Sequence, residues 1–209
     1  MINKKKIAKE LLKIKAVFLS PDKPFTWASG IKAPIYGDNR LIISYPKVRE
    51  LVENAMVENI KANFKNINAI VGTATAGIAH AAIIAHKMKL PAAYVRSKVK
   101  DHGRAKNIEG EIRKNANVVV IEDLMSTGRS SLEVVKILRD NKINVKGIFS
   151  IFTYGMKQCN DNLKQNKVKN FSLVDIDTLL DVAVKEKYIN VKQKDLILKF
   201  RKDPLNWIK

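Results

Sequence analysis

Apolar residues recur every three to four positions near the start of the chain and form short continuous runs after residue 68. The spacing of Ile7, Leu11 and Leu12 predicts an N-terminal helix, and a second amphipathic helix is expected after Tyr45-Pro46. Beyond them, runs rich in β-branched residues alternate with helical stretches, which predicts an α/β fold with a central, mainly parallel sheet flanked by helices. The expected strands are 69–72, 92–95, 118–121 and 147–152, and the expected helices between them are 77–88 and 130–141.

This alternation continues without an internal repeat or a low-complexity linker, so one domain is expected over residues 1–209. In open parallel sheets, ligands bind beyond the carboxyl ends of the strands. The residues that follow each predicted strand are therefore the first candidates for chemistry.

The strongest candidate is the segment VVVIEDLMSTGRSS, which runs from Val118 to Ser131. A buried strand is expected to end at Ile121, before Glu122 and Asp123, and a small, hydroxyl-rich loop then leads into a helix. Backbone N–H groups at a helix N-terminus form a site for a phosphate monoester. The same loop would also serve as an ordinary helix cap, but two adjacent carboxylates after a buried strand are costly without a ligand such as a metal ion or ribose hydroxyls.

Two further segments combine flexibility with anion-binding chemistry. Thr73–Gly77 follows a predicted strand and opens a helix, which makes it a second candidate anion site, although small residues before a helix are common. The stretch from Arg96 to Gly110 is polar and rich in cations, with Lys100 and His102 near its middle. Such a stretch is either a solvated basic loop or a mobile lid over a diphosphate.

The overall charge is strongly positive, with 39 Lys and Arg against 20 Asp and Glu. Nucleic-acid binding would explain this excess, but the cations are mostly Lys and are spread along the whole chain, so no nucleic-acid partner is expected. A single cysteine, Cys159, fits a reducing compartment. No apolar stretch approaches the roughly 20 residues that a membrane-spanning helix needs. We therefore expect a cytoplasmic protein that does not bind a membrane.

The acidic pair and the loop after it resemble the phosphoribosyl-diphosphate (PRPP) signature of the type I phosphoribosyltransferases. Together with FTWASGIKAPIYGDNR (25–40) and YVRSKVKDHGRAKNIEG (94–110), the chain is similar to the orotate phosphoribosyltransferases of that family. The resemblance implies the family fold, with a small hood built from about residues 1–45 and 155–209. It also implies transfer of the 5-phosphoribosyl group from PRPP to N1 of orotate, which gives orotidine 5′-phosphate and diphosphate in pyrimidine (UMP) biosynthesis.

The resemblance also assigns roles to residues. It implies catalytic roles for Lys100, His102 and Asp123. It places orotate against Ile35, Tyr36 and Ser126. Its expected PRPP contacts are Thr73, Ala74, Thr75, Arg96, Lys100, His102, Glu122, Asp123, Leu124, Met125, Ser126, Thr127, Gly128, Arg129 and Ser130.

The family pattern further implies a homodimer in which the Arg96–Lys100–His102 loop serves the neighbouring subunit. Mg²⁺ is expected to bind mainly through the PRPP diphosphate, with no dedicated protein ligands. Ala28 and Ser97 stand where many orotate enzymes have Lys. Two alternatives share the PRPP loop: a purine phosphoribosyltransferase, and a PRPP-sensing regulator without catalysis.

Overall fold

The computed structural model describes residues 4–26, 30–96 and 107–208. The catalytic candidates Lys100 and His102, and also Ala28 and Ser97, lie outside these ranges. The elements, in chain order, are α1 (Lys4–Lys13), β1 (Val17–Leu19), β2 (Phe25–Thr26), β3 (Lys32–Ala33), β4 (Ile35–Gly37), the 3₁₀ helix η1 (Asn39–Ser44), α2 (Pro46–Asn63), β5 (Ala69–Thr73), α3 (Gly77–Met88), β6 (Ala92–Val95), β7 (Ile108–Glu109), β8 (Asn117–Met125), α4 (Arg129–Asp140), β9 (Asn144–Thr153), α5 (Lys157–Gln165), β10 (Asn170–Asp175), α6 (Ile176–Lys185) and α7 (Val191–Lys202).

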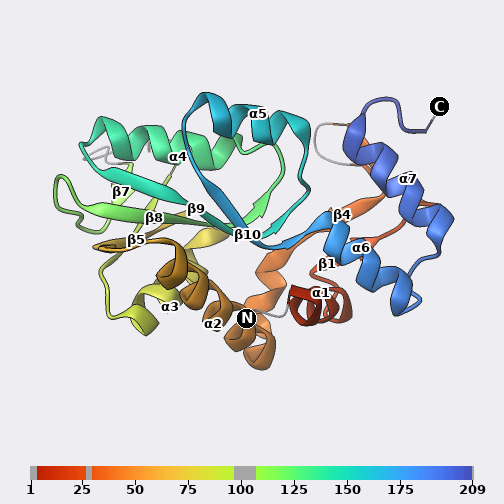
Figure 1. The fold of residues 1–209 in the computed structure, drawn as a ribbon, viewed down its shortest axis with the longest axis horizontal. Helices are drawn as coiled ribbons and strands as arrows, with labels where there is room; N and C mark the ends of the chain where they lie inside the picture. The colour runs from red at the N-terminus through yellow and green to blue at the C-terminus, as the bar shows by residue number, and fades with distance from the viewer. Residues whose placement is uncertain (1–3, 27–29, 97–106, 209) are drawn as a thin grey trace.

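A six-stranded sheet in the order β10-β9-β8-β5-β6-β7 forms the centre of the molecule (Figure 1). Every neighbouring pair in it is parallel except β6 and β7. Helices α4 and α5 cover one face, and α2 and α3 cover the other. The predicted fold class, a mainly parallel sheet flanked by helices, is confirmed.

The order in which the chain adds strands to the sheet reverses between β5 and β8, which are themselves parallel. From β5 the chain passes through α3 to β6 on one side, and it later returns to β8 on the other side of β5. A crevice opens at the carboxyl ends of two strands whose connections diverge in this way. The sheet topology therefore places a ligand site after Thr73 and after the end of β8.

Strand β8 is longer than the sequence pattern predicts. The expected strand stopped at Ile121 because two acidic residues follow it, whereas β8 continues to Met125. Its pairing with β9 explains this extension, since Leu124 and Met125 remain in register with Phe152 and Thr153. Glu122 and Asp123 are thus part of the sheet rather than of the loop that follows it. The short β7 and the edge strand β10 were not predicted.

The hood lies at one end of the sheet and draws on both ends of the described chain (Figure 1). Strand β1 pairs with β4, and β2 pairs with β3, both antiparallel. From the C-terminal part, α6 and α7 join the hood, whereas α5 packs on α4 and β10 completes the sheet. The side chain of Trp207 donates from Nε1 to the carbonyl of Lys32, at 2.8 Å, which ties the C-terminal segment to β3.

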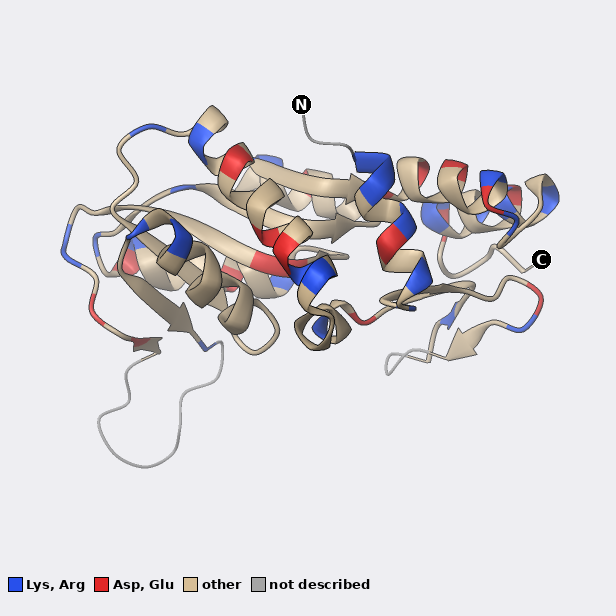
Figure 2. Cartoon of the chain, turned by 90° about the horizontal axis from the view of Figure 1, so that it is seen from below, with Lys and Arg blue, Asp and Glu red and all other residues tan. Residues whose placement is uncertain are grey.

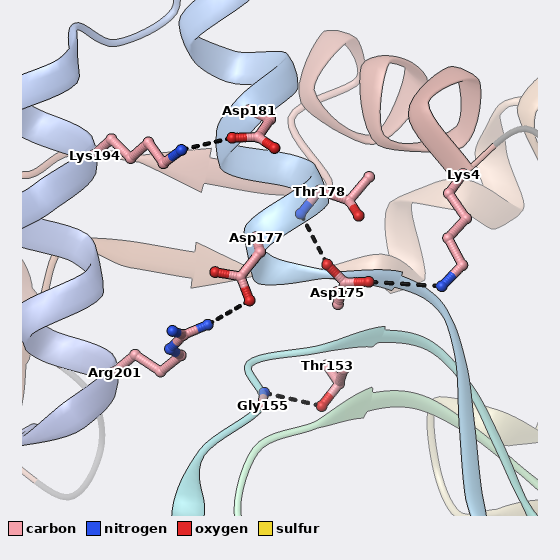
Figure 3. A network of polar contacts seen from close by, with 9 residues as sticks. All are labelled: Lys4, Thr153, Gly155, Asp175, Asp177, Thr178, Asp181, Lys194 and Arg201. Atoms are coloured by element: carbon pink, nitrogen blue, oxygen red, sulfur yellow. Dashed lines mark hydrogen bonds and ion pairs between the residues drawn. The ribbon is translucent and has the colours of Figure 1, made fainter.

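Ion pairs connect the hood helices with one another and with the sheet (Figure 3). Lys194 and Arg201 of α7 bind Asp181 and Asp177 of α6, each at 2.6 Å. Lys4 of α1 lies 3.7 Å from Asp175, at the end of β10. Half-exposed pairs of this kind contribute little individually, so the buried apolar side chains of α1 and α6 must supply most of the packing energy.

The positive charge is distributed over many elements. Figure 2 shows Lys and Arg on helices and loops along the whole length of the molecule, interspersed with Asp and Glu. They do not form a continuous stripe in this view, as a backbone-tracking nucleic-acid site would require. No helix of the described chain is both long and apolar enough to cross a membrane.

One buried ionisable pair lies between α2 and α3. His80 Nδ1 is 2.6 Å from Glu53 Oε1, and both side chains are almost completely buried. Neither His80 Nε2 nor Glu53 Oε2 has a hydrogen-bond partner among the described residues. A buried polar group that has no hydrogen-bond partner destabilises the folded state, so each of these two side chains depends on the other.

We therefore expect Glu53→Leu to lower the free energy of unfolding by about 2 kcal/mol, because it leaves His80 unsatisfied. Adding His80→Leu should recover part of this loss, since an apolar pair replaces the polar one. Urea unfolding measures both effects. Glu58→Leu, at an exposed position of the same helix, is the control. A double variant as unstable as the summed single variants would contradict this expectation.

Candidate functional site

Three neighbouring strand ends bring the predicted PRPP residues to one edge of the sheet. Thr73 is paired with Val95, so the ends of β5 and β6 lie side by side, and Ala74 N donates to Val95 O at 3.0 Å. On the other side of β5, Gly72 is paired with Ile121 of β8. The segments 73–75 and 122–130 and the residue Arg96 therefore lie at the same edge of the sheet, at the carboxyl ends of β5, β8 and β6.

The first of these loops depends on close contact between a strand and a helix. Gly77 begins α3, and a Cβ atom at this position would collide with the carbonyl oxygen of Ile121 in β8. The absence of a side chain lets the N-terminus of α3 approach the sheet, so its unpaired N–H groups lie near the carboxyl ends of the strands. In this loop Thr73 is buried, Ala74 is half-buried and Thr75 is exposed.

The second loop, residues 126–130, is held in place by a hydrogen bond from α5. Asn162 of α5 donates from Nδ2 to the carbonyl of Thr127, at 3.0 Å. Gly128 precedes α4 with φ of +75°, a conformation that favours glycine. A Cβ atom there would lie 3.2 Å from Cys159 Sγ and 3.3 Å from Met125 Cε. The loop thus has a fixed shape, and it presents Arg129 and Ser130 to solvent.

The two acidic residues of β8 lie in different environments. The Glu122 carboxylate is buried and already bonded: Ser131 Oγ donates to Oε2 at 2.6 Å, and Asp123 N donates to Oε1 at 3.1 Å. Asp123 is half-exposed. Asp123 is therefore the carboxylate of the pair that a ligand can reach, whereas Glu122 supports the turn into α4.

Burial also changes the protonation of Glu122. Removal of the carboxyl group from water, together with the nearby charge of Asp123, raises the pKa of Glu122 to about 8. The hydrogen bond from Ser131 opposes this shift. At neutral pH, the pair therefore carries less than its full formal negative charge.

The hood is joined to the acidic pair through Asn39. This side chain is completely buried and donates from Nδ2 to the main-chain oxygen of Asp123, at 2.8 Å. Tyr154, which follows β9, is also buried, and its side-chain hydroxyl is hydrogen-bonded to the backbone of Gly37 in β4. Because these contacts fix β4 against the end of β8, Ile35 and Tyr36 are held near the predicted PRPP residues. Of these two, Ile35 is buried and Tyr36 is exposed.

Arg96 lies at the beginning of the cation-rich segment. Its guanidinium donates to Tyr94 Oη at 3.1 Å and lies 3.4 Å from Glu109. Asn107 closes the base of the segment, since Arg96 N donates to Asn107 O and Asn107 Nδ2 donates to Arg96 O. Arg96 and Asn107 are therefore adjacent, at the carboxyl end of β6.

Four residues whose hydrogen bonds hold the site together were not identified from the sequence, namely Asn39, Ser131, Tyr154 and Asn162. Asn39 belongs to the polar run Asp38-Asn39-Arg40 directly after β4, and this run was the available signal. The side chain of Met125, one of the predicted PRPP contacts, is fully buried. The whole residue is inaccessible to solvent, and its main-chain oxygen accepts a hydrogen bond from Tyr154 N at 3.1 Å.

No three His, Cys, Asp or Glu side chains within the described ranges gather into a group that would hold a metal ion. The half-exposed Asp123 and the nearby hydroxyls suit a hard cation held mainly by substrate oxygens and water.

The raised pKa of Glu122 predicts a pH-dependent stability. Folded Glu122 keeps its proton up to about pH 8, whereas the ordinary value for this group is 4.5. The folded state therefore binds more protons between these values, and this group makes the free energy of unfolding fall as pH rises through that window. Glu122→Gln should remove this part of the slope.

Urea unfolding of the wild-type protein and the variant at about pH 5 and about pH 9 measures the difference. We expect the variant to gain stability relative to the wild type at the higher pH. A difference that is equal at both pH values would contradict the assignment.

Comparisons with known proteins identify the family of the chain. Residues 43–187 match the family model of the phosphoribosyl transferase domain. Orotate phosphoribosyltransferase from Listeria monocytogenes is 47% identical over 203 residues, which cover 97% of each chain. The enzyme of the same name from Streptococcus pyogenes serotype M1 is 50% identical over 201 residues, 96% of each chain.

A solved structure shows the same architecture. The crystal structure of orotate phosphoribosyltransferase from Aeropyrum pernix superposes with a TM-score of 0.76 at 27% identity, and the match covers 88% of this chain and 99% of that one. The resemblance inferred from the sequence motifs is therefore confirmed. The chain belongs to the phosphoribosyltransferase family, among the orotate phosphoribosyltransferases.

Proposed function

We propose that the protein transfers the 5-phosphoribosyl group of PRPP to N1 of orotate, yielding orotidine 5′-phosphate and diphosphate in de novo pyrimidine (UMP) biosynthesis. The relatives named orotate phosphoribosyltransferase support this assignment along nearly the whole chain. The observation that carries it is that two parts of the site are joined. One part is the end of β8, with the accessible Asp123 carboxylate and the phosphate-binding loop that follows. The other part is β4, which the Asn39 hydrogen bond holds beside the first.

In this proposal, the 5′-phosphate binds in the loop 126–130, at the N-terminus of α4, where backbone N–H groups and hydroxyls converge. Asp123 accepts hydrogen bonds from the ribose hydroxyls, and Glu122 supports it from within β8. The diphosphate lies against Thr73–Thr75, at the N-terminus of α3. Orotate lies between the backbone of Ile35-Tyr36 and Ser126.

The chemistry consists mainly of positioning and of charge stabilisation. As the bond between ribosyl C1 and the diphosphate loosens, C1 becomes positively charged and orotate N1 attacks from the opposite face. Negative charge grows on the leaving diphosphate. Mg²⁺ bound through the diphosphate oxygens would neutralise part of it, and Arg96, Lys100 and His102 would supply further positive charge.

We further propose that the protein works as a homodimer in the cytoplasm, with the segment containing Lys100 and His102 contributed to the neighbouring subunit. Arg96 and Asn107, the described residues on either side of this segment, are hydrogen-bonded to each other at the edge of the sheet. Such a shared site makes dimerisation a requirement for activity.

The activity is tested by mixing the protein with PRPP, Mg²⁺ and orotate and following the loss of orotate ultraviolet absorbance. Parallel reactions contain hypoxanthine or uracil. We expect PRPP-dependent consumption of orotate alone. Turnover of hypoxanthine instead would favour a purine phosphoribosyltransferase. PRPP binding without turnover of any base would favour a regulator.

The shared site is tested by subunit exchange between Lys100→Ala and Asp123→Asn proteins, each expected to be nearly inactive. In a mixed dimer, one site then has both substitutions and the other has none. Random mixing in equal amounts should restore about a quarter of the wild-type activity. Each variant mixed with itself is the control, and no recovery after verified exchange would refute the shared site.

A further inference from the structure

Arg40 is a cation next to the proposed base-binding strand that the site described above does not use. Its guanidinium binds Asp38 through two hydrogen bonds, from Nε to Oδ1 at 2.6 Å and from Nη2 to Oδ2 at 3.0 Å. The Arg40 side chain is 61% exposed. A solvent-exposed pair of this kind adds little stability, but its two parallel hydrogen bonds fix the plane of the guanidinium.

The backbone around Arg40 is also fixed relative to the crevice. Asp38 N donates to Ala16 O at 2.7 Å, and the next residue, Asn39, is hydrogen-bonded to the main chain of Asp123. Arg40 therefore follows directly after the residue that joins the hood to the ribose-binding carboxylate. The strand β4, with Tyr36, ends only three residues before it.

The electrostatic environment agrees with this location. The hydrogen bonds to Asp38 raise the pKa of Arg40, and smaller favourable interactions with Tyr36 and Asp123 act in the same direction. Arg40 thus interacts with a residue of each half of the proposed site, the base-binding strand and the end of β8.

Arg40 also retains hydrogen-bonding capacity. A guanidinium has five N–H donors, and Asp38 occupies one on Nε and one on Nη2. No partner of Nη1 is found among the residues that the structure describes. A planar carboxylate is the group that such a fork binds best.

We propose that Arg40, oriented by Asp38, binds the carboxylate of the pyrimidine substrate and so makes the enzyme select orotate over uracil. This inference rests on the proposed function and extends it to the part of the base that distinguishes these two pyrimidines. Arg40 is then a specificity-determining residue, and Asp38 is a positioning residue.

The test compares two nucleotides that differ only in this carboxylate. Calorimetry measures the affinity of wild-type protein and of Arg40→Gln for orotidine 5′-phosphate and for uridine 5′-phosphate. We expect the variant to lose about 10- to 100-fold in affinity for orotidine 5′-phosphate, the range for a charge-assisted hydrogen bond. Its affinity for uridine 5′-phosphate should change by less than about threefold, because that nucleotide has no carboxylate to lose.

Steady-state kinetics gives a second readout. The KM for orotate should rise in Arg40→Gln while the KM for PRPP stays close to the wild-type value. Arg40→Lys keeps the charge but not the fork, so it should show a smaller loss of orotidine 5′-phosphate affinity. Asp38→Asn should also show this smaller loss of affinity, because it loosens the guanidinium without removing it. Arg201→Gln is the matched control, since Arg201 also pairs with an aspartate at 2.6 Å, but on α7.

The outcomes separate this inference from the proposed function. If wild-type protein does not consume orotate, the proposed function fails and the inference fails with it. If the wild type consumes orotate but Arg40→Gln lowers the affinity for both nucleotides equally, or for neither, the inference alone is overturned. A combined rise in the KM of orotate and PRPP would also overturn it, because Arg40 would then act on the overall charge of the crevice.

Discussion

The hydrogen bond from Asn39 Nδ2 to the main-chain oxygen of Asp123 connects the two halves of this molecule at the point where ligands must meet. The sheet and its flanking helices supply the N-termini of α3 and α4 and an accessible carboxylate, whereas the hood supplies the edge of β4. A reaction between two substrates requires these parts to keep a fixed separation, because small displacements strongly reduce reactivity. Complete burial of Asn39 keeps water from competing for this bond.

The acidic pair shows how neighbouring residues of one strand acquire different tasks. Alternation along β8 turns Glu122 toward the interior and leaves Asp123 half-exposed. Glu122 then acts as an internal support for Ser131 and the start of α4, and burial favours its neutral form. A second full charge beside Asp123 would repel an anionic substrate, so partial neutralisation of Glu122 suits the proposed phosphate-binding site.

The sequence allowed prediction of the central layers because buried parallel strands are continuous apolar runs and their helices are amphipathic. Helix 77–88 and strand 92–95 have the predicted bounds. The polar residues after Ile121 predict an end of β8 that is too early, because pairing with β9 extends the strand to Met125. The contact between Asn39 and Asp123 joins residues 84 positions apart, and nothing local indicates such a contact. The roles of Lys100 and His102 remain predictions, since both lie outside the described residues.

The packing of α1 against α6 has a consequence for synthesis of the chain. Ile7 and Leu11 are buried in the finished protein, but α6 ends only at Lys185. At ribosomal rates of roughly 5–20 residues per second, α1 waits on the order of ten seconds for this partner. During that interval the strands through β8 can assemble and α1 can pack on α2, while the part of its apolar face that contacts α6 and β10 stays uncovered. Nascent chains of this enzyme therefore expose part of an apolar helix face until translation is nearly complete.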